Sequence, residues 1–301
     1  MTTEELLAGL IRVNLVGGLS VLAVLALRIP FRRMFGPELA YGLWAAPPLA
    51  AFATLLPART EDGADARNLI AATVGDYSGE LLMLWALGFA AVFAGLAFAQ
   101  KRFMDAVARG TAGPSVVGVI APRIVMPADD GTYTEEERAL IRAHEREHVA
   151  RMDPRAGALA SALQALCWFN PLVHLGAHVL RLDQELACDA AVLRRRPGAR
   201  ALYARTLLKT QLASQPLPFG CYWPARGPHP LEVRIGLLRS PRDDHGLAGP
   251  CLIAAGLIVM TYMGWRLNPP VPPPAPMVEL WRLNTGPTMS VMLVPAPGKA
   301  V

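Results

Sequence analysis

Apolar residues in this chain gather into four long windows that are separated by more polar segments. The windows are Leu6–Leu27, Leu39–Leu56, Leu81–Ala99 and Leu247–Leu267. Each approaches the ~20 residues that an α-helix needs to cross a hydrocarbon core of about 30 Å. The fourth is the weakest, because its uninterrupted apolar part is short. The pattern predicts four transmembrane helices.

The segment between the third and fourth windows is not a continuous apolar run, which predicts a helical domain inserted between two membrane helices. Its central stretch is Glu135–Asp153. Thr134 with Glu137 three residues later forms a capping box, which predicts the start of a helix, and Pro154 is expected to end it. The sequence thus predicts one continuous helix here.

Two further helices are predicted after this one. The apolar stretch Ala156–Phe169 is too short to span a membrane, so it is either a buried core helix or a helix lying against the bilayer. Asn170 and Pro171 interrupt it and begin the next helix, Leu172–Leu193. Both helices are expected to fold back on the helix of Glu135–Asp153.

The windows divide the chain into four parts. Residues 1–100 hold three membrane helices, residues 101–246 the inserted domain, residues 247–267 the fourth membrane helix and residues 268–301 a Pro-rich tail. The expected fold class is mainly α. The tail begins with a stiff polyproline spacer and is too short for an independent core.

Composition supports a membrane protein. Hydrophobic residues make up 53% of the 301 residues and charged residues only 18%, which is unusual for a soluble domain. The chain opens with Glu4 and Glu5 rather than with a basic segment. The first apolar helix is therefore expected to stay in the protein instead of being cleaved as a signal peptide.

Basic residues in the short loops predict the orientation. The first loop holds Arg28, Arg32 and Arg33, whereas the second combines two arginines with four acidic residues. Lys and Arg accumulate on the cytoplasmic side of membrane proteins. We therefore expect a multi-pass protein whose residues 101–244 are cytoplasmic and whose N-terminus and tail are external.

His144, Glu145 and His148 form an H-E-x-x-H motif inside the predicted helix. Residues four apart lie about 40° apart around a helix axis, so both histidines can give a ring nitrogen to one ion. Glu145 is placed to hold a water molecule whose pKa zinc would lower towards roughly 7, and to take its proton as it attacks a peptide carbonyl. The motif predicts a zinc metallopeptidase, and a polar surface helix is the alternative.

A catalytic zinc site needs a third protein ligand, and the next predicted helix offers Glu185 with Asp189 one turn later. Glu185 is expected to bind the one zinc ion per chain, and Asp189 to accept the outer N–H of a ligating histidine. His174 and His178 share this helix stripe but lie about 16 and 10 Å from Glu185 along the axis. Their roles stay open, and Cys188 is expected to be a small buried side chain rather than a ligand.

Taken together, these segments resemble the BlaR/MecR-type integral membrane metallopeptidases, metallopeptidase family fifty-six. The matching pieces are Pro122–Pro127, the H-E-x-x-H motif followed by Arg151 and Asp153, Trp168–Pro171, the E-x-x-C-D of Glu185–Asp189, and His229–Ile235. The resemblance covers residues 115–240. It implies a gluzincin-type domain in which His144, His148 and Glu185 bind zinc and Glu145 is catalytic.

The sequence departs from that family's pattern in two respects. Arg146 and Glu147 place two charges inside the motif, where small or apolar residues are usual, and this suggests a wetter helix face. Family members that sense beta-lactams carry a large penicillin-binding domain after the last membrane helix. Residues 268–301 are too few for such a domain, so we expect the chain to lack that sensor.

The resulting hypothesis is a zinc endopeptidase of the bacterial inner membrane that transduces a signal by regulatory proteolysis. The resemblance implies a protein substrate, a BlaI/MecI-like repressor or the protein itself. A scaffold with vestigial proteolysis and a general quality-control protease are the alternatives. The net charge of +5 comes without any DNA-binding motif, which favours the lipid bilayer over nucleic acid as a partner. Homo-oligomerisation, the substrate and the inducing signal stay open.

Overall fold

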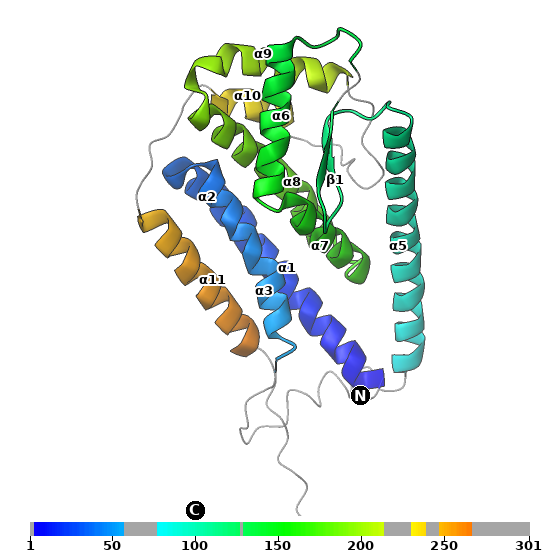
Figure 1. The fold of residues 1–301 in the computed structure, drawn as a ribbon. Helices are drawn as coiled ribbons and strands as arrows, with labels where there is room; N and C mark the ends of the chain where they lie inside the picture. Colours follow the sequence, from blue (N-terminus) through cyan, green and yellow to red (C-terminus); the bar gives the residue numbers. More distant parts are fainter. Residues whose placement is uncertain (1–2, 57–76, 127–128, 214–229, 239–246, 267–301) are drawn as a thin grey trace, which may run out of the picture.

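The computed structural model describes residues 3–56, 77–126, 129–213, 230–238 and 247–266. Most of these residues are helical, which confirms the expectation of a mainly α protein. The expected outer loop and the Pro-rich tail lie outside the described residues. Figure 1 shows α1 and α11 slanting in the same direction and α5 standing at one side, with shorter helices gathered at one end.

Three of the described helices are long and apolar enough to cross a membrane. They are α1 (Thr3–Phe35), α5 (Ser78–Ala108) and α11 (Ala248–Arg266). They contain the first and third apolar windows and nearly all of the fourth. None of the apolar window of α5 and only 11% of that of α11 is buried inside the protein, so these side chains need an apolar solvent around them. The three helices indicate a membrane protein.

The second apolar window forms a helical run in three pieces, α2 (Pro37–Gly42), the 3-10 turn η1 (Leu43–Ala45) and α3 (Ala46–Ala53). Pro47 and Pro48 have no backbone N–H to donate to the preceding turn, and this explains why the helix tightens just before them. The run packs between α1 and α11. A Cβ added at Gly264 of α11 would lie 2.5 Å from the carbonyl oxygen of Ala50, so this crossing needs a glycine. Whether this run spans the membrane stays a prediction.

The region between α5 and α11 begins with a small antiparallel hairpin of β1 (Ser115–Val117) and β2 (Arg123–Val125), in which Val116 lies opposite Ile124. The following elements are α6 (Glu135–Ala150), α7 (Asp153–Leu166), α8 (Pro171–Arg195), the 3-10 turn η3 (Pro197–Ala199), α9 (Arg200–Ala213) and α10 (Pro230–Leu238). In Figure 1, α6, α9 and α10 lie at the end of the molecule opposite the chain's N-terminus.

A hydrophobic cluster joins four of these helices. Its buried members are Leu140 of α6, Val192 of α8, Tyr203 and Leu207 of α9, and Leu238 of α10. Burying such side chains is the main favourable term in folding. The cluster fixes α6 and α8 against each other and brings α9 and α10 over them.

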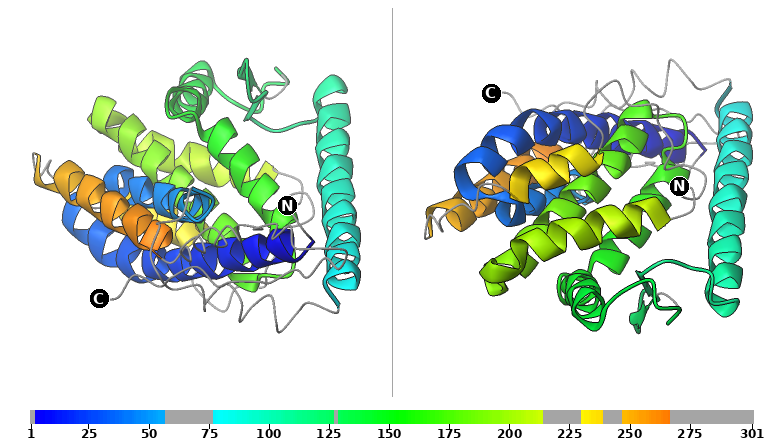
Figure 2. Two further views of the ribbon diagram at one scale, coloured as in Figure 1. Left: turned by 90° about the horizontal axis from the view of Figure 1, so that it is seen from below. Right: turned by 90° about the horizontal axis from the view of Figure 1, so that it is seen from above.

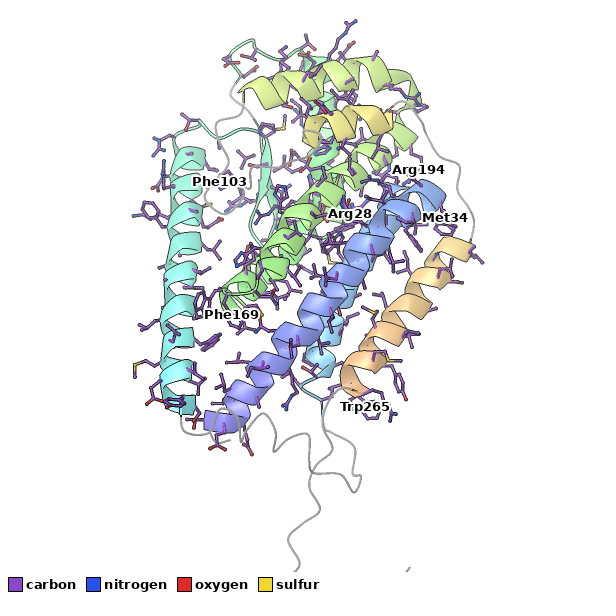
Figure 3. The ribbon with its side chains drawn as sticks, turned by 180° about the vertical axis from the view of Figure 1, so that it is seen from behind. Arg28, Met34, Phe103, Phe169, Arg194 and Trp265 are labelled. Atoms are coloured by element: carbon purple, nitrogen blue, oxygen red, sulfur yellow. The ribbon has the colours of Figure 1, made fainter. Side chains whose placement is uncertain are left out.

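The tip of the α7–α8 hairpin is held between two membrane helices. The indole N–H of Trp85 in α5 donates to the carbonyl oxygen of Leu166 at 2.9 Å, and that of Trp168 donates back to Trp85 O at 3.2 Å. A Cβ at Gly88 would overlap the Trp168 ring. Figure 3 shows Phe169, at this tip, next to α5.

The other side of the tip contacts α1. The amide of Asn170 donates to the carbonyl oxygen of Asn14 at 3.1 Å, while its own oxygen caps α8 by accepting from Leu172 N. Asn14 is buried and donates to Leu10 O within α1. Figure 2 shows α5 standing to one side of the other helices in both views. The hairpin tip therefore bridges α5 to the rest of the protein.

Candidate metal centre

Helix α6 presents the H-E-x-x-H motif, and its predicted capping box is confirmed. The Thr134 hydroxyl accepts from Glu137 N at 3.2 Å, and the Glu137 carboxylate accepts from Thr134 N at 2.9 Å. His144 and His148 lie one turn apart in this helix, with their Nε2 atoms 3.1 Å apart. The helix thus directs both ring nitrogens to one point, as the spacing predicts.

The turn after α6 differs from the expectation. The helix ends at Ala150, and Pro154 lies in the first turn of the next helix, where a missing N–H costs nothing. Between them Met152 has a φ of 59°, a left-handed conformation that is uncommon for a residue with a side chain. This sharp turn folds Asp153 back towards α6.

The carboxylate of Glu185 in α8 completes a cluster of three candidate metal-binding groups. Its Oε2 lies 3.3 Å from His144 Nε2, and its Oε1 lies 3.5 Å from His148 Nε2. Ligands about 2.0–2.2 Å from a tetrahedral zinc ion are separated from one another by roughly 3.3–3.6 Å. The three observed separations are close to that range, so these residues could hold zinc.

Glu145 lies beside this cluster and is 6% exposed. Burial raises the pKa of its carboxyl group above the ordinary value, although the two neighbouring histidines oppose the shift. A carboxylate with a raised pKa is a stronger base. Glu145 could therefore accept a proton from a water molecule near the three candidate ligands.

The outer nitrogen of His148 contacts a buried carboxylate. Its Nδ1 lies 2.7 Å from Asp153 Oδ2, and Asp153 is only 5% exposed. A carboxylate accepts here, so the proton sits on Nδ1 and the lone pair of Nε2 faces the cluster. Cys188 lies behind this pair, with its Sγ 3.5 Å from Asp153 Oδ2. It is fully buried, as expected, and burial raises the pKa of its thiol to about 11.

The outer nitrogen of His144 meets a tyrosine that the sequence did not point to. Tyr203 of α9 lies with its hydroxyl 2.8 Å from His144 Nδ1, and it donates to Asp189 Oδ1 at 2.6 Å. Asp189 was expected to accept from a ligating histidine, and its Oδ1 lies 3.4 Å from His144 Nδ1, farther than the Tyr203 hydroxyl. Because the Tyr203 proton goes to Asp189, its oxygen accepts from His144 Nδ1–H, which leaves Nε2 free for a metal.

Arg234 of α10 links the two acidic residues of α8. It donates to Asp189 through two hydrogen bonds of 2.8 Å, and its Nη1 lies 2.8 Å from Glu185 Oε2. Burial alone would raise the pKa of Asp189, but Arg234 outweighs it and holds this pKa at about 2. Arg234 belongs to the segment His229–Ile235 that the sequence singled out, but no spacing rule ties it to the site.

Two other sequence expectations have different outcomes. Arg146 is exposed, but Glu147 is 5% exposed and pairs with Arg195 of α8, so the helix face at Glu147 is not exposed to water.

His174 forms its contacts at the hairpin tip, where its Nε2 lies 2.8 Å from Trp168 O and its Nδ1 lies 3.3 Å from the amide of Gln164. His174 therefore serves the hairpin tip instead of the cluster.

Replacing Arg234 with methionine is expected to destabilise the protein by about 3–5 kcal/mol, because the carboxylate of Asp189 would stay buried without its cation. Arg234→Lys should recover only part of this loss, since an ammonium group cannot make the bidentate contact. Urea unfolding of the metal-free protein in detergent micelles measures both. The exposed Arg196→Met is the matched control, and an equal effect of both methionine variants would contradict the prediction.

Comparison with known proteins adds the family context. Residues 106–238 match the model of the BlaR1 peptidase M56 family. Over 81 residues the chain is 33% identical to the regulatory protein BlaR1 of Bacillus licheniformis, a match that covers 27% of this chain and 14% of that protein. No solved structure matches the chain. All the residues of the cluster and their partners described above lie inside the matched segment.

Proposed function

We propose that this protein is a membrane zinc endopeptidase, and the match of residues 106–238 to the BlaR1 peptidase M56 family supports this. The observation that carries the proposal is the convergence of His144 Nε2, His148 Nε2 and the Glu185 carboxylate at separations of 3.1–3.5 Å. The buried Glu145 lies beside them. Two histidines and one glutamate are the ligand set of catalytic rather than of structural zinc sites.

A bound zinc ion would supply a Lewis acid for the substrate carbonyl and would lower the pKa of water in the site. In the proposed reaction, Glu145 takes a proton from the attacking water and then delivers it to the leaving amine. Asp153 and Tyr203 keep the Nδ1 protons of His148 and His144 in place, so that both Nε2 lone pairs face the same point. Arg234 balances the negative charge of Asp189 and restrains the position of the Glu185 carboxylate.

The proposed substrate is a protein on the cytoplasmic side. The relative is named a regulatory protein, and this supports regulatory proteolysis of a cytoplasmic transcriptional repressor, of the chain itself, or of both. The candidate centre lies towards the end of the molecule where α1 and α5 finish and α11 begins (Figure 1). The basic residues that were expected in the first loop, Arg28, Arg32 and Arg33, lie instead in the C-terminal part of α1. Their charge favours the cytoplasm for that end.

Cleavage is tested by comparing new protein N-termini in cells that carry the active protein with those in cells that carry Glu145→Gln. Cleaved substrates should appear only with the active form, in the cytosolic or the membrane fraction. The same comparison with a zinc chelator on purified membranes checks that cleavage depends on metal. Identical sets of N-termini in both cell types would contradict the proposal.

The proposed orientation predicts the outcome of reporter fusions. Fusions at Ala64, Ala112 and Pro276 should report external, cytoplasmic and external positions, because the basic loops anchor the chain in that direction. Paired alkaline phosphatase and fluorescent protein reporters measure this, since each is active on one side only. An external signal at Ala112 would invert the topology and remove every cytosolic protein as a substrate.

A further inference from the structure

His148 is linked through Asp153 to Tyr41, which lies outside the matched residues 106–238. Tyr41, in α2, donates its hydroxyl hydrogen to Asp153 Oδ1 at 2.8 Å. The other oxygen of the same carboxylate, Oδ2, holds His148 Nδ1 at 2.7 Å. Asp153 is thus held on both oxygens, by Tyr41 on Oδ1 and by His148 and the Cys188 thiol on Oδ2. A short chain of hydrogen bonds therefore runs from the membrane region to a candidate zinc ligand.

Tyr41 is itself held in place from two sides. Gln184 of α8, which is 7% exposed, donates its amide N–H to the Tyr41 hydroxyl at 3.1 Å. The guanidinium of Arg151, in the turn after α6, lies 4.9 Å from the centre of the Tyr41 ring. With its ring and its oxygen both restrained, the hydroxyl can direct its proton only to Asp153. This is the arrangement of a positioning group rather than of an incidental contact.

A second, separate contact docks the same part of the chain on α8. Asp183 is 2% exposed, and its Oδ2 accepts from Trp44 Nε1 at 2.8 Å. Arg28 of α1 contacts both oxygens of Asp183 at 3.0 Å, and Figure 3 shows Arg28 between α1 and α8. This docking contact involves neither His148 nor Asp153. It offers a way to loosen the interface without touching the hydrogen-bond chain.

We propose that Tyr41 is a positioning residue of the metal centre, acting through Asp153 on His148. Without the hydroxyl, Asp153 loses the donor that fixes one of its oxygens, and the His148 ring loses its fixed angle. Partners that orient a metal ligand typically change metal affinity or activity by 10–100-fold. The inference rests on the proposed zinc site. It implies that residues 106–238 alone would form an incomplete enzyme.

The test is the zinc affinity of the full-length protein in detergent micelles, measured by competition with a coloured chelator. Tyr41→Phe removes one oxygen atom and is expected to weaken zinc binding about tenfold. Trp44→Phe removes the indole donor to Asp183 and is the matched control, expected to bind zinc like the wild type. Visible absorption of the cobalt-substituted proteins gives a second readout, which should shift for Tyr41→Phe and not for Trp44→Phe.

Three results would overturn the inference. Unchanged zinc affinity and an unchanged cobalt spectrum in Tyr41→Phe would show that the hydroxyl does not position His148. Equal losses in Tyr41→Phe and Trp44→Phe would assign the effect to looser docking of the membrane helices. Wild-type protein that binds no zinc at all would overturn the proposed function, and the inference with it.

Discussion

A Glu145→Gln protein is expected to bind zinc as tightly as the wild type and to lose peptidase activity by a factor of about 10²–10⁴. The amide has nearly the same shape as the carboxylate but cannot accept the proton of the attacking water. Single-turnover cleavage of a substrate found by N-terminal sequencing, together with zinc analysis, measures both quantities.

Glu136→Gln is a suitable control, because Glu136 is exposed in the first turn of the same helix. It should leave zinc content and cleavage unchanged. Full activity in Glu145→Gln would show that another group takes the proton. Loss of zinc together with activity would instead mean that Glu145 supports the metal, and the roles proposed for the three neighbouring residues would have to change.

Removing any one of the candidate ligands should reduce bound zinc well below one ion per chain. His144→Ala, His148→Ala and Glu185→Ala each leave two of three protein ligands, which is too few to retain zinc against a moderate chelator. Elemental analysis of the purified proteins after dialysis gives the stoichiometry. Activity should disappear in all three variants, because the proposed reaction needs the bound ion.

His174→Ala is the control for this series, since His174 lies on α8 like Glu185 but bonds to the hairpin tip. It should retain its zinc. Full zinc occupancy in Glu185→Ala would place the third ligand elsewhere, and Asp189, one turn along the same helix, would be the next candidate. Such a result would also leave Arg234 without an obvious reason to contact Glu185.

The sequence was informative where a single helix carries the signal. The spacing of His144 and His148 and the four-residue step from Glu185 to Asp189 follow from the helical repeat, and the structure brings the two pairs together. Tyr203, Asp153 and Arg234 could not be assigned in this way. They come from α9, α7 and α10, and only the packing of those helices decides which atoms meet.

Burial of charge was the hardest feature to predict. Glu147 was expected on a wet face, because an isolated carboxylate avoids the protein interior. It is buried because Arg195, 48 residues later, pairs with it.

The break in the second apolar window had a visible cause in Pro47 and Pro48. The contacts of the α7–α8 tip with α1 and α5 could not be predicted from the sequence, because a hydrogen bond from a side chain to a distant carbonyl oxygen produces no periodic pattern of residues.

The hairpin tip between α1 and α5 has a practical consequence for work on the protein. A recombinant fragment limited to residues 106–238 would lack Asn14, Trp85 and Gly88, which surround Trp168 and Asn170. The fragment would expose the Trp168 ring and leave the Asn170 amide without its partner in α1, and aggregation during expression is the expected result. The unit recognised by sequence comparison is therefore smaller than the unit that folds. Preparations of the protein should retain the flanking apolar helices and begin with a choice of detergent or lipid.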